Sequence, residues 1–565
     1  MIVTQTGAAV GEALDRALAA LTRGQQGDHW AGKLSSSALA TAMSIAALYV
    51  VDPATHREAV ESGRAWLFAT QDRDGGWGDA VLDQPNVNAT SLCGAALALT
   101  ASAASGSGDT AGLERALRCL AQHFGGFEVV GDPARCTLSG PCRTLSALAG
   151  LMDWRKIKRL RPEVVLLPRR LRRTISTTFP AYLSIATLHS TRAPHVLNAL
   201  PTYRLARNTA LDWLARAQGP NGSFEESAFL TSVIVTCVVA AGLRHLPWIK
   251  RAVAFILDSQ REDGSWPIDR DLETFDTDLA IFAFNEVGVD LPGSQRVAEW
   301  LLRQQVNETC FATGAPAGGW GWAKPSGWPD TDDTAYTLLA LRALGVPSDT
   351  VALQQGTKWL AWMQDGDGSW STFVRGSHMP FDHDCPYVTG HAVSALHAAG
   401  YLKRNGERLQ RALAYLRRAQ RADGSFASIW FREATAGTAS VLQALCDVGL
   451  ADCAMAVRAR NALLLNQNDD GGWGGVRGQA STAEETAWAV MALLDSDAGG
   501  VAPPANLGVE WLVQHQQSNG AWPSWPIGLY YSAMWYSDSM YALALPAQAL
   551  ARASRRGFPQ CGSAS

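Results

Sequence analysis

Three carboxyl groups, those of Asp330, Asp332 and Asp333, stand close together in the segment PDTDDT. Clustered carboxylates keep a proton within the group, because like charges a few ångström apart do not all ionise. A carboxylic acid kept protonated in a dry site is a general acid, and it can attack even a base as weak as an alkene. Aspartates at helix starts also serve as N-caps, and Asp330 fits that role. The segment therefore predicts a proton donor, a helix start, or both.

A seven-residue pattern recurs along the whole chain around this motif. The pattern Gln-x-x-x-Gly-x-Trp/Phe occurs seven times, beginning at Gln71, Gln218, Gln260, Gln364, Gln420, Gln467 and Gln516. An apolar helical pattern precedes each copy, as in DWLARAQ, and a helix rich in Ala and Leu follows most of them, as in TAWAVMALL. The Gly suits a turn with positive φ after a helix, and the Gln amide suits exposed backbone groups at helix ends. Each copy predicts a helix–turn–helix unit.

Such a unit cannot bury its own apolar face, so neighbouring units must stack. The spacing of the copies predicts an all-α fold of two toroids, one over residues 24–274 and one over residues 275–552. The amphipathic N-terminal helix, residues 8–22, is expected to pack on the second toroid. The repetition also accounts for the 52 Gly and 21 Trp residues of the chain.

Composition limits the compartment and the partners. The chain has 565 residues, a formal net charge of −4 and ten scattered Cys, without CxxC pairs. This balance gives no general attraction to nucleic acid, and single thiols favour a reducing cytoplasm. The first residues lack the charged and apolar regions of a signal peptide, and the apolar runs are shorter than the ~18–20 residues of a membrane span. We expect a cytoplasmic protein that is soluble or peripheral on the inner membrane face.

The repeat and the acid motif together resemble triterpene cyclases of the squalene–hopene cyclase type, over nearly the whole chain. The segments DHWAGKLSSSALATA, PEVVLLP, FDTDLAIFAF, GGWGWAKPSGWPDTDD, VTGHAVSAL and STAEETAWAVMALL follow one another in the family's order. The resemblance implies two α-barrel (αα-toroid) domains with a large apolar cavity between them. It also implies a class II terpene cyclase, which protonates squalene or a related polyprene to start cyclisation. Asp332 is then the proton donor, with Asp330 and Asp333 in support.

The same resemblance assigns further site residues. His391 stands where the family places a histidine that hydrogen-bonds the catalytic aspartate, although a lone His in an apolar helix is also a common core residue. Aromatic faces stabilise cations without quenching them. The resemblance assigns this task to residues that suit ordinary core positions equally well: Phe275, Trp322, Trp525, Trp535 and Tyr536.

A basic stretch, residues 154–173, holds nine Lys/Arg and one Glu. Interleaved with apolar residues, it favours contact with anionic lipid headgroups and thus delivery of a lipophilic substrate from a membrane. A solvated basic face is the plain alternative. A third interpretation is a diphosphate site that uses Arg172 and Arg173.

Departures from the family's pattern bear on the substrate and leave two other functions open. SSSALATA offers hydroxyls where the family has a carboxylate, and TISTTFPAYL lacks a family tryptophan. A class II cyclase of a sesqui- or diterpene-type prenyl diphosphate would use Mg²⁺ to bind the pyrophosphate. A non-cyclase toroid resembling a prenyltransferase subunit is the other alternative, and FDHDC with His391 would then suggest zinc. For a squalene-like substrate no cofactor and no metal are expected. Chain length, ring number, the terminating step and a homodimer stay open.

Overall fold

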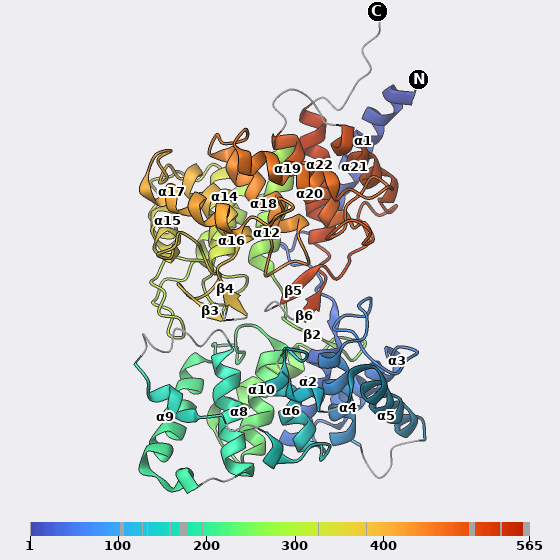
Figure 1. Ribbon diagram of the computed structural model, residues 1–565, viewed down its shortest axis with the longest axis vertical. Coiled ribbons are helices and arrows are strands. Elements are labelled where there is room, and N and C mark those ends of the chain that lie inside the picture. Colours follow the sequence, from blue (N-terminus) through green and yellow to red (C-terminus); the bar gives the residue numbers. More distant parts are fainter. Residues whose placement is uncertain are drawn as a thin grey trace, which may run out of the picture.

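The computed structural model describes residues 2–101, 107–126, 128–132, 134–157, 160–168, 178–193, 196–325, 327–379, 381–496, 503–530 and 534–556. Over these residues the chain is mainly helical, with only short strands. The helices form two groups stacked along the long axis of the molecule (Figure 1). The predicted all-α toroid fold is confirmed.

The first group contains a closed ring of inner helices. Around the ring, α2 contacts α4, α4 contacts α6, α6 contacts α8, α8 contacts α10, and α10 returns to α2. Outer helices α3, α5, α9 and α11 each pack on an inner one. The inner helices are α2 (Ala38–Val51), α4 (Val87–Leu99), α6 (Ser139–Leu148), α8 (Phe179–Arg192) and α10 (Ala228–Ala240). The outer helices are α3 (Arg57–Ala69), α5 (Ser107–Cys119), α9 (Pro201–Ala217) and α11 (Pro247–Asp258).

The second group is built in the same way from a larger inner ring, which runs α12, α14, α16, α18, α20, α22 and back to α12. Outer helices α13, α15, α17, α19 and α21 surround it. The inner helices are α12 (Glu273–Val287), α14 (Thr331–Ala343), α16 (Pro386–Ala398), α18 (Thr435–Asp447), α20 (Ala483–Ser496) and α22 (Tyr541–Arg555). The outer helices are α13 (Ser294–Gln304), α15 (Val351–Met363), α17 (Glu407–Ala419), α19 (Ala454–Leu465) and α21 (Pro503–His515).

Inner and outer helices differ in sequence because they differ in surroundings. Inner helix α10 (AFLTSVIVTCVVA) is buried along nearly its whole length and is apolar on every side. Outer helix α17 (ERLQRALAYLRRA) buries one stripe that includes Leu409, Leu413 and Leu416, and leaves Arg417 and Arg418 exposed. A helix covered on all sides reads as continuously apolar, whereas a surface helix keeps a 3.6-residue period.

The repeated turns join each outer helix to the next unit. In every copy the Gly has a positive φ, between 86° and 99°. The Gln amide donates to the carbonyl of that Gly and to a backbone carbonyl of the neighbouring outer helix, as Gln364 does to Gly368 and Arg408 at 3.1 and 3.0 Å. Where the aromatic is Trp, its Nε1–H donates to a carbonyl ten residues earlier, for example Trp370 to Leu360 at 2.8 Å. The repeat thus satisfies backbone groups that helix ends leave open.

The two chain ends of the second ring meet at α1 (Ile2–Gly24), which contacts α12, α21 and α22. Gln516 of the last repeat donates to the carbonyl of Ala13, so α1 fills the outer position that closes this ring. The expected division at residues 274 and 275 stays a prediction.

Short strands lie where the two groups meet (Figure 1). They pair as antiparallel hairpins or bridges: β1 (Ser36–Ser37) with β2 (Trp266–Pro267), β3 (His378–Met379) with β4 (Asp382–His383), and β5 (Gly528–Tyr530) with β6 (Met534–Tyr536).

Candidate active site

The acid motif forms the first turn of α14. Asp330 is the N-cap, and its Oδ1 accepts the backbone N–H of Asp333 at 2.9 Å. Thr334 accepts the backbone N–H of Trp320 at 2.9 Å and so fixes the preceding turn. Asp332, two residues after the cap, takes part in neither of these two hydrogen bonds. The N-cap alternative is therefore realised for Asp330, and Asp332 is free to face a different environment.

Burial controls the protonation of the neighbouring carboxyls. It raises the pKa of Asp330 well above the ordinary value, and the charge of Asp333 raises it further. Burial also raises the pKa of Asp333 to about 7. On α12, burial raises the pKa values of Asp276 and Asp278 well above the ordinary range. At neutral pH this group of carboxyls therefore retains protons.

Helix α16 brings His391 against the acid. Its Nδ1 lies 2.6 Å from Asp332 Oδ1, and the two side chains are only 12% and 13% exposed. Its Nε2 lies 3.3 Å from the hydroxyl of Tyr336. The rings of Tyr336 and Tyr387 stand edge-on to the imidazole, with centroids 4.6 and 4.3 Å away. Because an ionised carboxylate only accepts hydrogen bonds, Nδ1–H is the donor in the ionised pair.

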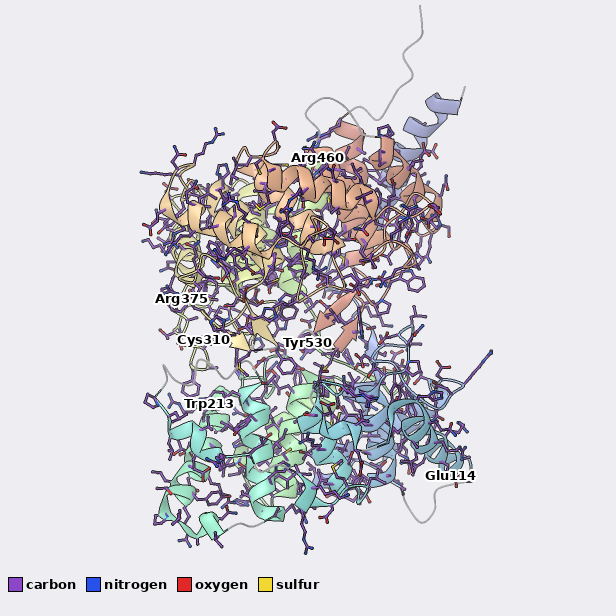
Figure 2. The ribbon with its side chains drawn as sticks, viewed as in Figure 1. Glu114, Trp213, Cys310, Arg375, Arg460 and Tyr530 are labelled. Carbon is purple, nitrogen blue, oxygen red and sulfur yellow. The ribbon has the colours of Figure 1, made fainter. Side chains whose placement is uncertain are left out.

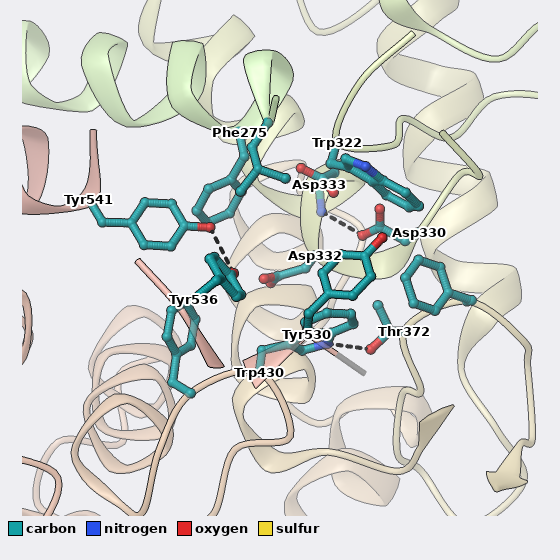
Figure 3. A pocket seen from close by; sticks show the side chains of 13 residues that line it. Phe275, Trp322, Asp330, Asp332, Asp333, Thr372, Trp430, Tyr530, Tyr536 and Tyr541 are labelled. Atoms are coloured by element: carbon teal, nitrogen blue, oxygen red, sulfur yellow. Dashed lines mark hydrogen bonds between the residues drawn. The ribbon is translucent and has the colours of Figure 1, made fainter. Parts of the chain in front are cut away.

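A pocket with about 510 Å³ of empty space opens in front of Asp332. Aromatic rings make up most of its wall, and Figure 3 shows Asp332 among them. The lining residues are Leu272, Phe275, Trp322, Asp330, Asp332, Asp333, Thr372, Phe373, Trp430, Phe431, Tyr530, Tyr536 and Tyr541.

Three of the five aromatic residues assigned from the sequence line this pocket: Phe275, Trp322 and Tyr536. The other two, Trp525 and Trp535, do not line this pocket, and their assignment stays a prediction. Trp535 lies between Met534 and Tyr536 on strand β6, and successive side chains of a strand point to opposite faces, so it turns away when Tyr536 turns inward. Trp525 is 37% exposed, in the loop before the hairpin.

Five aromatic wall residues were missed by sequence reasoning: Phe373, Trp430, Phe431, Tyr530 and Tyr541. Most share a signal with Trp322, because they lie between the aromatic of a repeat and the inner helix that follows. Phe373 follows Trp370 and Trp430 follows Phe426 within a few residues. Trp322 follows Trp320, which ends a lengthened copy of the repeat in which Gln305 donates to Gly318 and Ala352. The loops that follow the repeat aromatics therefore build most of the pocket wall. The positions of these residues along the chain would have been enough to indicate this.

A second cavity, with about 790 Å³ of empty space, lies on the other side of His391 along the axis of the second ring. All six inner helices contribute polar groups or apolar walls to it, including Tyr336, Ser394, Gln443 and Gln548. Its outer end is bounded by Arg552, which forms ion pairs with Glu286 and Asp495.

The facing sides of the two groups also meet through aromatic contacts. Trp213 of α9 lies at the upper side of the first group, near the loop that carries Cys310 (Figure 2). Its ring centroid is 5.6 Å from that of Phe311, and the guanidinium of Arg216 lies 4.1 Å from the centre of the Phe311 ring. The loop after α13 thus docks on the first group.

Two groups proposed from the sequence have a different outcome. Arg169, Arg170, Arg172 and Arg173, with most of TISTT, lie outside the described residues. Of the residues in the zinc alternative, His391 has its Nδ1 against Asp332, and His383 has its Nδ1 2.8 Å from the carbonyl oxygen of Asp384. Within the described ranges, no three His, Cys, Asp or Glu side chains are grouped to hold a metal ion.

Two stacked helical rings with a buried acid in an aromatic pocket define the class of terpene cyclases. The chain belongs to the squalene–hopene cyclase family: residues 272–555 match the squalene–hopene cyclase C-terminal domain and residues 14–180 the N-terminal domain. Residues 167–274 match the prenyltransferase alpha-alpha toroid domain. The family resemblance and the enzyme class inferred from the sequence are confirmed.

The relatives have more than one activity. The squalene–hopene cyclase of Alicyclobacillus acidocaldarius is 27% identical over 90% of this chain and 91% of its own. That of Bradyrhizobium diazoefficiens is 34% identical, but the match spans 44% of this chain and 43% of the relative. A drimenyl diphosphate synthase of Streptomyces showdoensis is 28% identical over 50% of this chain and 51% of its own. Among solved structures, ent-copalyl diphosphate synthase from Streptomyces platensis matches with a TM-score of 0.62 at 19% identity, covering 97% of this chain and 99% of its own. This last likeness concerns the fold.

Proposed function

We propose that this protein is a class II cyclase that converts squalene, or a related diphosphate-free polyprene, into a polycyclic terpenoid, with Asp332 as the proton donor. One observation carries the proposal: the Asp332 carboxyl lies in the wall of an aromatic pocket while its Oδ1 is held 2.6 Å from His391 Nδ1. The acid therefore faces the space where an alkene would lie, and its conjugate base has a donor already in contact.

The first step is a proton transfer from Asp332 to the terminal double bond. The alkene π electrons form the new C–H bond, the neighbouring carbon becomes a tertiary cation, and Asp332 becomes a carboxylate. The His391 Nδ1–H stabilises this carboxylate, and burial favours the protonated forms of Asp330 and Asp333, which reduces the negative charge beside it. Each further double bond then attacks the cation in turn, until a proton is lost or water adds.

The aromatic wall stabilises the moving positive charge. Ring faces attract a cation by about 0.5 kcal/mol at exposed sites and about 2 kcal/mol or more where water is excluded. Phe275, Trp322, Trp430, Phe431 and Tyr536 surround the space beside Asp332. Because none of these groups is a good base, they do not quench the cation early. The axial cavity runs from His391, the partner of Asp332, to Arg552, and it offers a route by which the proton of Asp332 can be restored.

The substrate is proposed to be diphosphate-free and the reaction to need no metal. The matches to both squalene–hopene cyclase domains support a squalene-like substrate, while the drimenyl diphosphate synthase relative supports the alternative of a prenyl diphosphate. The test is to incubate the purified protein with squalene, farnesyl diphosphate and geranylgeranyl diphosphate, each with and without EDTA. Gas chromatography–mass spectrometry would then identify the products. A cyclic product from squalene, unaffected by EDTA, is expected; EDTA-sensitive turnover of a diphosphate alone would replace squalene by that substrate.

A peripheral membrane position is proposed for substrate uptake. No helix in the described part of the chain is both long and apolar enough to cross a membrane. Exposed apolar side chains lie within the basic stretch, among them Leu166 and Leu167, which are 40% and 42% exposed. Replacing Arg169, Arg170, Arg172 and Arg173 by Gln should reduce co-sedimentation with anionic vesicles at low salt. Equal sedimentation of both forms would remove the basic stretch as the anchor.

A further inference from the structure

Asp79 is a buried carboxyl of the first group that contacts the second group. It lies in the loop after the first repeat, between Trp77 and helix α4, and is fully buried. Its Oδ1 accepts a hydrogen bond from the Asn86 side-chain amide at 2.8 Å, and its Oδ2 accepts the backbone N–H of Trp535 at 2.9 Å. One carboxylate therefore joins the start of α4 to strand β6, which is 456 residues away along the chain.

The strand that Asp79 holds carries part of the pocket wall. The next residue after Trp535 is Tyr536, whose ring lines the space before Asp332. The Tyr536 hydroxyl lies 3.3 Å from that of Tyr541, another wall residue (Figure 3). A backbone shift at Trp535 would move the Tyr536 ring directly, because the two residues are adjacent on one short strand.

The hydrogen bonds of Asp79 depend on its charge. Both partners are donors, so only the ionised carboxylate accepts from both without conflict. The pKa of Asp79 is raised to about 7. Burial is the main cause and the charge of Asp83 adds to the increase, whereas the two hydrogen bonds oppose it. Cys93 and Cys142 also lie near this carboxylate, and its charge adds to the increase that burial causes in their thiol pKa values.

We propose that Asp79 is a positioning residue of the cyclase, which fixes the Tyr536 wall of the cavity from the opposite helical ring. This inference rests on the proposed cyclase activity. When Asp79 takes up a proton, one of its two oxygens becomes a hydroxyl that faces a donor, and the hydrogen bond at that oxygen is weakened or lost. The cation that develops near Tyr536 is then less well stabilised. A misplaced ring is expected to lower kcat by about 3- to 30-fold, the span of one cation–π contact.

Exchanging the two partners gives a sharp test. In Asp79→Asn the new amide faces the Asn86 amide and the Trp535 N–H, so one bond of the network must break. In the double variant Asp79→Asn/Asn86→Asp the amide donates to the new carboxylate and accepts from Trp535. Asp, like Asn, is a good N-cap, so α4 keeps its cap, which Asn86 provides to the Ala89 N–H at 3.0 Å. The exchanged pair thus restores every hydrogen bond but leaves no titrating group against Trp535.

The three proteins are compared by kcat, KM and melting temperature between pH 6 and pH 8, on the substrate that the wild-type protein cyclises. At pH 8 the single variant should have a reduced kcat and the exchanged pair a near-wild-type kcat. The ratio of kcat for the exchanged pair to kcat for the wild type should rise as pH falls from 8 to 6, because only the wild type loses the contact. Apart from the carboxyl that Asn86→Asp introduces, the other titrating groups are common to both proteins and cancel in this ratio.

Each outcome is decisive. A single variant that melts lower but keeps the wild-type kcat, together with a flat ratio, would make Asp79 purely structural and overturn the inference. If the single variant does not fold, the pH dependence of the ratio still decides. A wild-type protein without cyclised product would instead remove the proposed function, so the two failures are distinct.

Discussion

The starts of helix α4 in the first ring and helix α14 in the second ring are built alike but differ in chemistry. Asn86 caps α4 and Asp330 caps α14, each accepting the N–H three residues later. Four residues after the cap, Thr90 and Thr334 each accept the N–H of the preceding repeat aromatic, at 3.1 and 2.9 Å. The cap and the threonine are therefore parts of the scaffold in both rings.

The position two residues after the cap separates the two helices. In α4 it is Asn88, whose amide oxygen accepts the N–H of Leu138 at 3.1 Å and whose amide nitrogen donates to Thr137 at 2.9 Å. In α14 it is Asp332, which faces the aromatic pocket and contacts His391. The position two residues after the helix cap therefore holds a packing residue, Asn88, in the first ring and the candidate acid, Asp332, in the second ring.

Replacing Asp332 should have the largest effect. Asp332→Asn is nearly isosteric but removes the transferable proton, so product formation should fall by at least about 10⁴-fold. Circular dichroism and melting temperature should stay close to those of the wild type. The matched change Asn88→Ala should lower the melting temperature, because it leaves buried partners unpaired, while the folded protein keeps its kcat. Comparable loss of kcat in both variants would erase the distinction between the two helices.

Removing His391 should have the next largest effect. His391→Ala should slow turnover by about 10²–10⁴-fold, since the Asp332 carboxylate loses the donor at 2.6 Å. Tyr336→Phe removes only the contact to His391 Nε2, so we expect about a 2- to 10-fold loss. Measuring kcat for both variants against pH would separate the two roles. An unchanged rate in His391→Ala would reduce this residue to core packing.

The role of Asp330 as the N-cap of α14 can be separated from its role as a carboxyl next to Asp332. Asp330→Asn keeps an N-cap side chain and replaces a protonated carboxyl by a neutral amide, so kcat should fall by less than about tenfold with little change in melting temperature. Ser37→Ala at the start of α2 removes a cap that accepts the Ala40 N–H, so it should cost about 0.5–2 kcal/mol of stability. Its kcat should not change. Thermal melts and steady-state rates check both.

The helical scaffold and the candidate acid could be predicted from the sequence, but only part of the pocket wall could. The Gly and Gln of each repeat have one geometric role, so the ring fold could be predicted. A further repeat was missed because Gln305 donates to Gly318, 13 residues later, so a long loop breaks the pattern. Which of Trp535 and Tyr536 faces this pocket could not be predicted, because the strand direction that turns Tyr536 inward depends on pairing with β5 and on distant contacts.

The smallest effect expected is on stability as a function of pH. Burial raises the pKa of Asp79, Asp333, Asp382 and Asp538 to about 7 and that of Glu484 to about 8. The native state therefore binds more protons than the unfolded state between about pH 4 and pH 8, and the free energy of unfolding falls as pH rises through this window. Melting curves at pH 6 and pH 8 should show the higher melting temperature at pH 6. Asp333→Asn should reduce the difference, and a melting temperature that rises from pH 6 to pH 8 would contradict this assignment.

Deuterium labelling tests the central claim, proton transfer from Asp332, most directly. The protein is equilibrated in D₂O, so that exchangeable carboxyl protons become deuterons, and is then incubated with squalene. Mass spectrometry and NMR of the product should find one carbon-bound deuterium, at the CH carbon of the former terminal alkene, and Asp332→Asn should form no labelled product. A cyclic product without deuterium at that carbon, or a labelled product from Asp332→Asn, would contradict the account.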